Sequence, residues 1–268
     1  MKRETESKLV ALLFMILAVV MAAGNVQGAL AGNAGAPSVA QDSSVISLVQ
    51  SAIETKAHST SITVTLPKPP TEGDALVGAI SLPTIGPSAP TVTGVVEGKA
   101  KWHLAVAKMS ASRDEDVELW YTLNVDPNPK MVNVTFQLSN DFSLRTLAVV
   151  AEFSNIATSK ALDTTGGAQR DCANTCAITS GTLTTSNSNE LVVAFLGNNF
   201  MSESNSGKWS GSPSGGFKLF GGAPFNKEGA ESDYKIAATP KIATTSDVFV
   251  DSLPFDWCGV VAAFFSQP

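Results

Sequence analysis

The sequence contains few charged residues and no basic cluster. Only 16% of its 268 residues are Asp, Glu, Lys or Arg, whereas 44% are hydrophobic. Disordered chains carry more charge and less apolar mass, so we expect a folded protein with a proper core. The net charge is −6, and no group of Lys and Arg residues could neutralise a phosphate backbone. These features argue against nucleic-acid binding.

The sequence also lacks the motifs of common catalytic sites. Its two histidines, His58 and His103, lie far apart, and no G-x-S-x-G motif surrounds a serine. We therefore expect no His-based metal or hydrolytic site and no cofactor. Two carboxylates that hydrolyse glycosides can come from anywhere in a sequence, and no such pair stands out here.

The N-terminus has the pattern of an export signal. Three basic residues precede the uninterrupted apolar run 9–23. That run is shorter than the roughly 20 residues that span a bilayer, and Ala29 and Ala31 form a cleavage-site pattern. We expect 1–31 to be a signal peptide and 32–44 a flexible lead-in, so the protein is secreted or lies on the cell surface. An uncleaved membrane anchor is the alternative, because two acidic residues dilute the basic region.

Residues 45–268 contain short apolar segments separated by turn residues. Ile62, Val64 and Leu66 alternate with threonines, which is the period-two pattern of a half-buried strand. No segment of this part has sustained helical periodicity, and we find no internal repeat. The pattern predicts one all-β domain, an antiparallel β-sandwich of jelly-roll type. The predicted core consists of Ile62, Val64, Leu76, Leu119, Tyr121, Val134, Phe136, Val149, Phe153, Val193 and Phe195.

Several segments resemble a known group of proteins. The order of "EGDALV", "VELWYTLNV", "NELVVA" and "WCGVVAAFF" resembles that of secreted microbial β-sandwich modules from bacterial or archaeal cell-surface and phage-tail proteins. The resemblance covers roughly residues 46–265 and implies the sandwich fold. It carries over no catalytic signature, and the loop with Cys172 and Cys176 departs from it.

Two tryptophans are candidates for ligand contact. On a strand over 117–125, Tyr121 shares an apolar face with leucine and valine residues, so we expect it in the core. Trp120 points to the other face beside Glu118, which we expect to be wet. There Trp120 could stack on a sugar, unless a loop covers it. Trp209 lies in a Ser/Gly-rich loop and is the better candidate for an exposed aromatic.

The three cysteines predict one short disulfide. Cys172 and Cys176 lie in a polar loop of a protein that leaves the cytoplasm, so we expect them to be bonded to each other. Cys258 lies in an apolar strand and is expected to be a free, buried thiol. A bond from Cys258 to one of the other two is the alternative.

Two further motifs are weak. Asn133 begins a glycosylation sequon and should face outward. Asp114 and Asp116 supply oxygens of the kind that Ca²⁺ prefers, but the run lacks a calcium-loop pattern, which favours a solvated loop end over a calcium site.

Together these features predict a non-catalytic structural or adhesive protein outside the cytoplasm, in a role that can include self-assembly. Its partner would be a second copy of itself or a surface polysaccharide. A carbohydrate-binding module is the first alternative, based on Trp120 and Trp209. A secreted glycoside-acting hydrolase is the second.

Overall fold

The computed structural model describes residues 45–83, 89–126, 132–141, 145–172, 176–198, 208–210, 213–221, 230–250 and 255–268, except the side chains of 208–210 and 248–250. The predicted signal peptide and lead-in lie outside the described residues. The described chain belongs to one compact unit, Ser43–Pro268. All its regular structure is β-strand, and its strands pair antiparallel.

The strands are β1 (Ser47–Lys56), β2 (Ser61–Thr65), β3 (Ala75–Pro83), β4 (Val92–Val96), β5 (His103–Met109), β6 (Glu115–Thr122), β7 (Asn133–Leu138), β8 (Thr146–Ser154), β9 (Leu162–Cys172), β10 (Cys176–Thr179), β11 (Leu183–Thr184), β12 (Glu190–Asn198), β13 (Lys208–Ser210), β14 (Lys218–Gly221), β15 (Ala230–Ala237), β16 (Ile242–Ala243), β17 (Ser246–Val250) and β18 (Phe255–Phe264).

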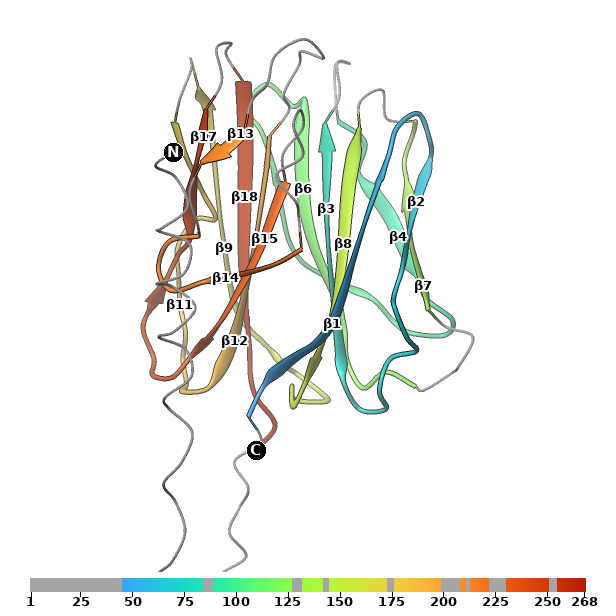
Figure 1. Ribbon diagram of the computed structural model, residues 1–268, viewed down its shortest axis with the longest axis vertical. Coiled ribbons are helices and arrows are strands. Elements are labelled where there is room, and N and C mark those ends of the chain that lie inside the picture. The colour runs from blue at the N-terminus through green and yellow to red at the C-terminus, as the bar shows by residue number, and fades with distance from the viewer. Residues whose placement is uncertain are drawn as a thin grey trace, which may run out of the picture. The chain divides into compact units, whose positions relative to one another are not determined.

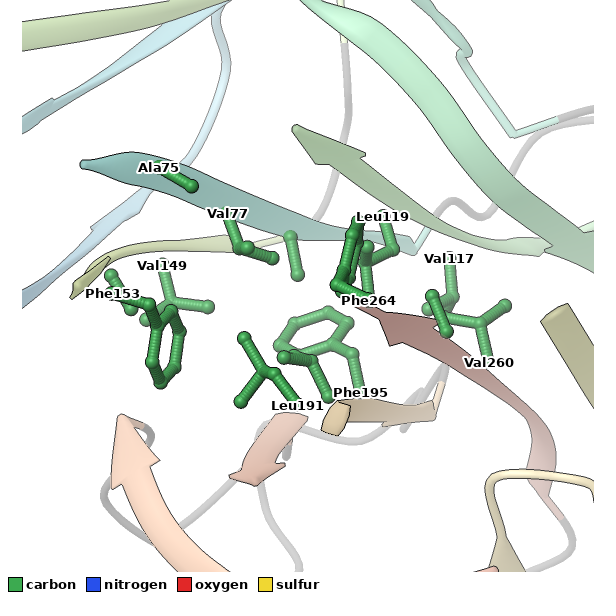
Figure 2. Close-up of a cluster of buried hydrophobic side chains, with 14 of the residues drawn as sticks. Ala75, Val77, Val117, Leu119, Val149, Phe153, Leu191, Phe195, Val260 and Phe264 are labelled. Atoms are coloured by element: carbon green, nitrogen blue, oxygen red, sulfur yellow. The ribbon is translucent and has the colours of Figure 1, made fainter. Parts of the chain in front are cut away.

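Two five-stranded sheets pack face to face around the largest core. Their strand orders are β1-β8-β3-β6-β5 and β14-β15-β12-β18-β9. Phe153, Phe195 and Phe264 are almost completely buried between them. Figure 2 shows this core, with Val77, Leu119 and Val149 from one sheet and Leu191, Phe195 and Phe264 from the other. The predicted antiparallel sandwich is confirmed at this level.

Further strands cover the outer faces of both large sheets. The three-stranded sheet β2-β7-β4 packs on the first sheet, with Ile62 and Phe136 against Ile80. The sheet β10-β17-β13 and the pair β11-β16 cover the second. In Figure 1 these layers follow one another from β2, β4 and β7 on the right to β11, β13 and β17 on the left. The described chain therefore has several hydrophobic clusters where the sequence predicted one core.

Burial of the predicted core residues is largely confirmed. Ten of the eleven are buried, and only Tyr121 is half-buried. The expected wet face at Trp120 is wrong, and the alternative that the chain covers Trp120 is nearer, although a sheet and not a loop covers it. Trp120 is half-buried and packs against the cluster under β2-β7-β4. All nine residues of β3 are buried, as expected for a strand covered on both faces.

The two halves of the chain repeat one topology. In chain order the first large sheet contains β1, β3, β5, β6 and β8, and the second contains β9, β12, β14, β15 and β18. Matched in that order, the strands occupy the same places, because β1-β8-β3-β6-β5 corresponds to β9-β18-β12-β15-β14. The small sheets β2-β7-β4 and β10-β17-β13 correspond in the same way.

The register of the central strands agrees with this duplication. Ile80 of β3 pairs with Glu118 of β6, and Ala194 of β12 pairs with Asp233 of β15. Two residues further along, Leu82 pairs with Asp116 and Leu196 pairs with Glu231. The equivalent core positions carry different apolar residues, so the repeat is not evident from the sequence.

Glycines allow the outer layers to approach the large sheets closely. A Cβ atom added to Gly78 would lie 2.9 Å from Cζ of Phe136. One added to Gly259 of β18 would lie 2.1 Å from the backbone oxygen of Thr179, at the end of β10. A backbone atom cannot move aside as a flexible side chain can, so Gly259 is the stricter requirement.

We expect Gly259→Ala to lower the free energy of unfolding by about 1–3 kcal/mol, as overpacking of a dense interior does. Urea denaturation should show a lower midpoint. Gly94→Ala is the control, since its nearest neighbour would be Oε1 of Gln137 at 3.6 Å, and it should change stability by about 0.5 kcal/mol or less. Equal stability of the two variants would contradict this account of the contact between β18 and β10.

Candidate functional site

A groove of about 700 Å³ lies at the ends of β5 and β6. Its wall comes from three segments: 97–103 before and at the start of β5, 121–126 at the end of β6, and 158–160 between β8 and β9. The third segment joins the two halves of the chain. The volume is in the range of about 300–1,000 Å³ that is typical of small-ligand sites.

Two rings form the aromatic part of the groove. His103 and Tyr121 lie opposite each other on β5 and β6, with ring centroids 5.5 Å apart and planes inclined by 32°. Tyr121 also meets the ring of Phe264 edge-on, at 5.3 Å. The prediction that Tyr121 is a pure core residue is therefore corrected. It lies at the end of β6 next to the edge strand β5. There one part of its side chain packs against the core and the rest lines the groove.

Glu97 supplies a buried carboxyl to the groove. Only 3% of its surface is exposed, and its Oε1 accepts no hydrogen bond from any described group. Burial raises the pKa of Glu97, and the negative charge of Asp126 raises it further. An unsatisfied buried oxygen costs free energy, so a ligand hydroxyl that donates to Glu97 would relieve that cost.

Three lysines lie on the rim of the groove. Lys99 and Lys101 come from the segment before β5, and Lys160 comes from the segment between the two halves. All three are exposed, as is Asp126. Lys160 and Asn124 adopt the left-handed backbone conformation, with φ of 50° and 53°. This conformation is common for Asn but disfavoured for Lys.

The tryptophans proposed as ligand contacts occupy other places. The half-buried Trp120 does not line the groove, and its Nε1 donates to Oε2 of Glu118 at 2.6 Å. The backbone of Trp209 belongs to β13 and pairs with Phe249, so its expected loop position is wrong. The exposure of the Trp209 side chain lies outside the described residues and stays a prediction.

The segment that supplies most of one groove wall was not identified from the sequence. This segment is the charged stretch "EGKAKWH", residues 97–103.

The cysteine predictions are confirmed. Cys172 and Cys176 form a disulfide that links the end of β9 to the start of β10, with Cα atoms 6.3 Å apart. Cys258 is free and buried, and its Sγ lies 3.7 Å from the backbone oxygen of Glu115. Burial raises the pKa of the Cys258 thiol far above its usual range, so this side chain is not a ready nucleophile.

Asn133 faces outward as expected. It is exposed at the start of β7, and Oγ1 of Thr65 donates a hydrogen bond to its Oδ1 at 2.9 Å. Glycosylation of Asn133 stays a prediction.

The acidic residues considered for calcium point to different surroundings. Asp114 accepts from Oγ of Ser110 at 3.1 Å and hydrogen-bonds with Asp256, whereas Asp116 is buried beside Glu118. Within the described ranges, no group of three His, Cys, Asp or Glu side chains could hold a metal ion. The geometry therefore gives no support to a calcium site at Asp114 and Asp116.

Buried carboxyl groups are paired with each other in both halves. Desolvation, together with Glu118, raises the pKa of Asp116 to about 8. Desolvation, together with Asp233, raises the pKa of Glu231 to about 9. Asp116 and Glu118 on β6 occupy the positions of Glu231 and Asp233 on β15 in the duplicated register. The carboxyl pairs are therefore a feature of the repeated fold and not of the groove.

No protein-family model matches the chain, and comparison with curated proteins found no matching relative. In the part of the chain that the structure describes, no helix is long and apolar enough to cross a membrane.

We expect the protein to be more stable at pH 5 than at pH 9. The folded state keeps protons on Asp116, Asp233 and Glu231, with pKa values of about 8, 7 and 9, whereas unfolded carboxyls lose theirs near pH 4. Between these values the folded state binds more protons, so stability falls as the pH rises. Melting temperatures across this range measure the effect.

Glu231→Gln should flatten this pH dependence, because it removes the carboxyl with the highest of these three pKa values. Glu72→Gln, at an exposed position, serves as the control and should leave the slope unchanged. A melting temperature that is constant or rises from pH 5 to pH 9 would contradict the raised pKa values of these buried carboxyl pairs.

Proposed function

We propose that the protein is a non-catalytic adhesive protein that acts outside the cytoplasm and binds a polysaccharide in the groove beside Tyr121. The observation that carries this proposal is a buried carboxyl oxygen without a hydrogen-bond partner, on Glu97, in the same groove as the rings of Tyr121 and His103. The proposed location rests on the apolar run 9–23 and the small residues after it. Self-assembly stays a separate prediction.

The chemistry of the groove suits a sugar. Sugar rings have apolar faces that pack on aromatic side chains, and their hydroxyls need polar partners. Tyr121 offers an aromatic surface that Phe264 holds in place. Glu97 offers an acceptor, and Thr122, Asn124 and Ser159 offer further polar side chains along the wall.

The proposed fold of each half agrees with this function. We take β1-β8-β3-β6 and β2-β7-β4, and likewise β9-β18-β12-β15 and β10-β17-β13, to be the sheets of two jelly rolls. Support comes from the alternation of the chain between the large and small sheets, as in β1, β2, β3 and β4. Jelly rolls are frequent among lectin domains.

Retention on insoluble polysaccharides tests the proposal. The full chain should bind at least one of cellulose, chitin, xylan, pectin or peptidoglycan. His103→Asn removes one groove ring and should weaken retention about tenfold, equivalent to about 1.4 kcal/mol. His58→Asn is the matched control, because His58 is exposed and outside the groove. Failure to bind any of these polymers, or equal losses in both variants, would refute polysaccharide binding in this groove.

Hydrolysis of the bound glycan is a second candidate, favoured by one pair of residues. Glu97 and Asp126 both line the groove, one buried with a raised pKa and the other exposed. Two carboxyls in different environments are the usual acid and base of glycosidases. The retained glycan should then release reducing ends, and Glu97→Gln should stop the release while binding persists. Binding without release of reducing ends would support the adhesive function and contradict hydrolysis.

A further inference from the structure

We propose that the groove selects anionic saccharides, which carry uronate or sulfate groups, over neutral ones. This inference rests on the proposed polysaccharide-binding function and assigns the chemical class of the ligand. It follows from the charges around the groove, from the burial of Glu97 and from a comparison of the two halves of the chain.

The exposed charge of the groove is positive. Lys99, Lys101 and Lys160 approach it from two separate segments, and Asp126 is the one exposed carboxylate among its described lining residues. The chain as a whole has a net charge of −6, so the exposed charge of the groove has the opposite sign to that of the whole chain. Three ammonium groups around one cleft attract an anion and increase its rate of association.

Glu97 is the other acidic residue that lines the groove. A charged carboxylate there would repel uronate or sulfate, and burial weakens this repulsion because it raises the pKa of Glu97. Its Oε1 still lacks a hydrogen-bond partner among the described groups, so a sugar hydroxyl that reached it would satisfy a buried acceptor. The groove can thus bind the hydroxyls inside and the negative groups at the rim.

A comparison of equivalent positions in the two halves shows which residues the common fold requires and which belong to the groove alone. Tyr121 pairs with Val77 in the first half, and the equivalent pair in the second half is Ile236 with Leu191. The common fold therefore accepts an aliphatic residue where the groove has its tyrosine. We infer that the ring serves the groove and not the architecture that both halves share.

The backbone conformation of Lys160 also supports a role for this residue in the groove. Its φ of 50° is a conformation that Gly or Asn would adopt more easily. A lysine in such a conformation carries a local backbone strain. Strained positions of this kind cluster at functional sites, and here the strained residue brings positive charge to the rim from the segment between the halves.

Calorimetric titration of the full chain tests the inference. The probes are oligosaccharides of galacturonate, of alginate and of chondroitin sulfate, each compared with its carboxyl-reduced or desulfated neutral form of equal length. At least one anionic probe should bind at least tenfold more tightly than its neutral form. That preference should shrink between 50 and 300 mM salt, because salt screens exposed charges.

Two groove variants locate the effect. Lys160→Asn removes the charge and suits the left-handed backbone, and the double variant Lys99→Gln, Lys101→Gln removes the charges of the other segment. Each should weaken binding of the anionic probe at least fivefold without lowering the melting temperature. The control is Lys218→Gln, Lys241→Gln, which removes two exposed charges outside the groove and should bind like the parent.

The outcomes distinguish the two levels of the proposal. If neutral and anionic forms bind equally, or if the control loses as much affinity as the groove variants, the preference for anions is overturned and polysaccharide binding stands. If no probe and no insoluble polysaccharide binds, both fail.

Discussion

Burial of both faces of β3 and β12 determines how the rest of the protein is arranged. Leu76 and Ile80 of β3 point into one cluster, and Val77 and Ala79 point into another. Such a strand needs a sheet on each side, because exposing either row would cost about 25 cal/mol for each Å² of apolar surface. The two large sheets therefore pack against each other and acquire outer layers. The groove lies where β5 begins and β6 ends, beside the segment that joins the two halves.

The buried acids show how the fold accommodates polar groups within these layers. Glu118 accepts a hydrogen bond from the backbone nitrogen of Val92 and another from Nε1 of Trp120. It thereby connects β6 to β4, at the boundary between a large sheet and its outer layer. Asp233 has the equivalent position in the second half, and Oγ1 of Thr245 donates to it at 3.2 Å. Both halves thus place hydrogen-bonded carboxyls under their outer strands.

Much of the fold could be predicted from local patterns, and the site could not. Alternation at Ile62 and Val64 and the apolar run before Phe195 were sufficient to predict strands and buried residues, because the period of the side chains depends only on the backbone. The position of Trp120 was mispredicted because polar neighbours such as Glu118 suggested a wet face, whereas hydrogen bonds satisfy them under an outer sheet. Short-range spacing cannot reveal which segments meet across layers. For the same reason the sequence alone did not bring Glu97 and Lys160 to one groove.

The core between the two large sheets can be completed only after strands of both halves have been synthesised. Phe264, near the C-terminus, packs against Tyr121 and completes the cluster under β3 and β6. During synthesis the first half therefore emerges from the ribosome with one side of its large sheet uncovered, and it stays so until β12 and β18 follow. An apolar sheet in that condition is prone to aggregate or to bind chaperones. Formation of β18, which carries Phe264, thus covers the apolar face that the first half leaves exposed.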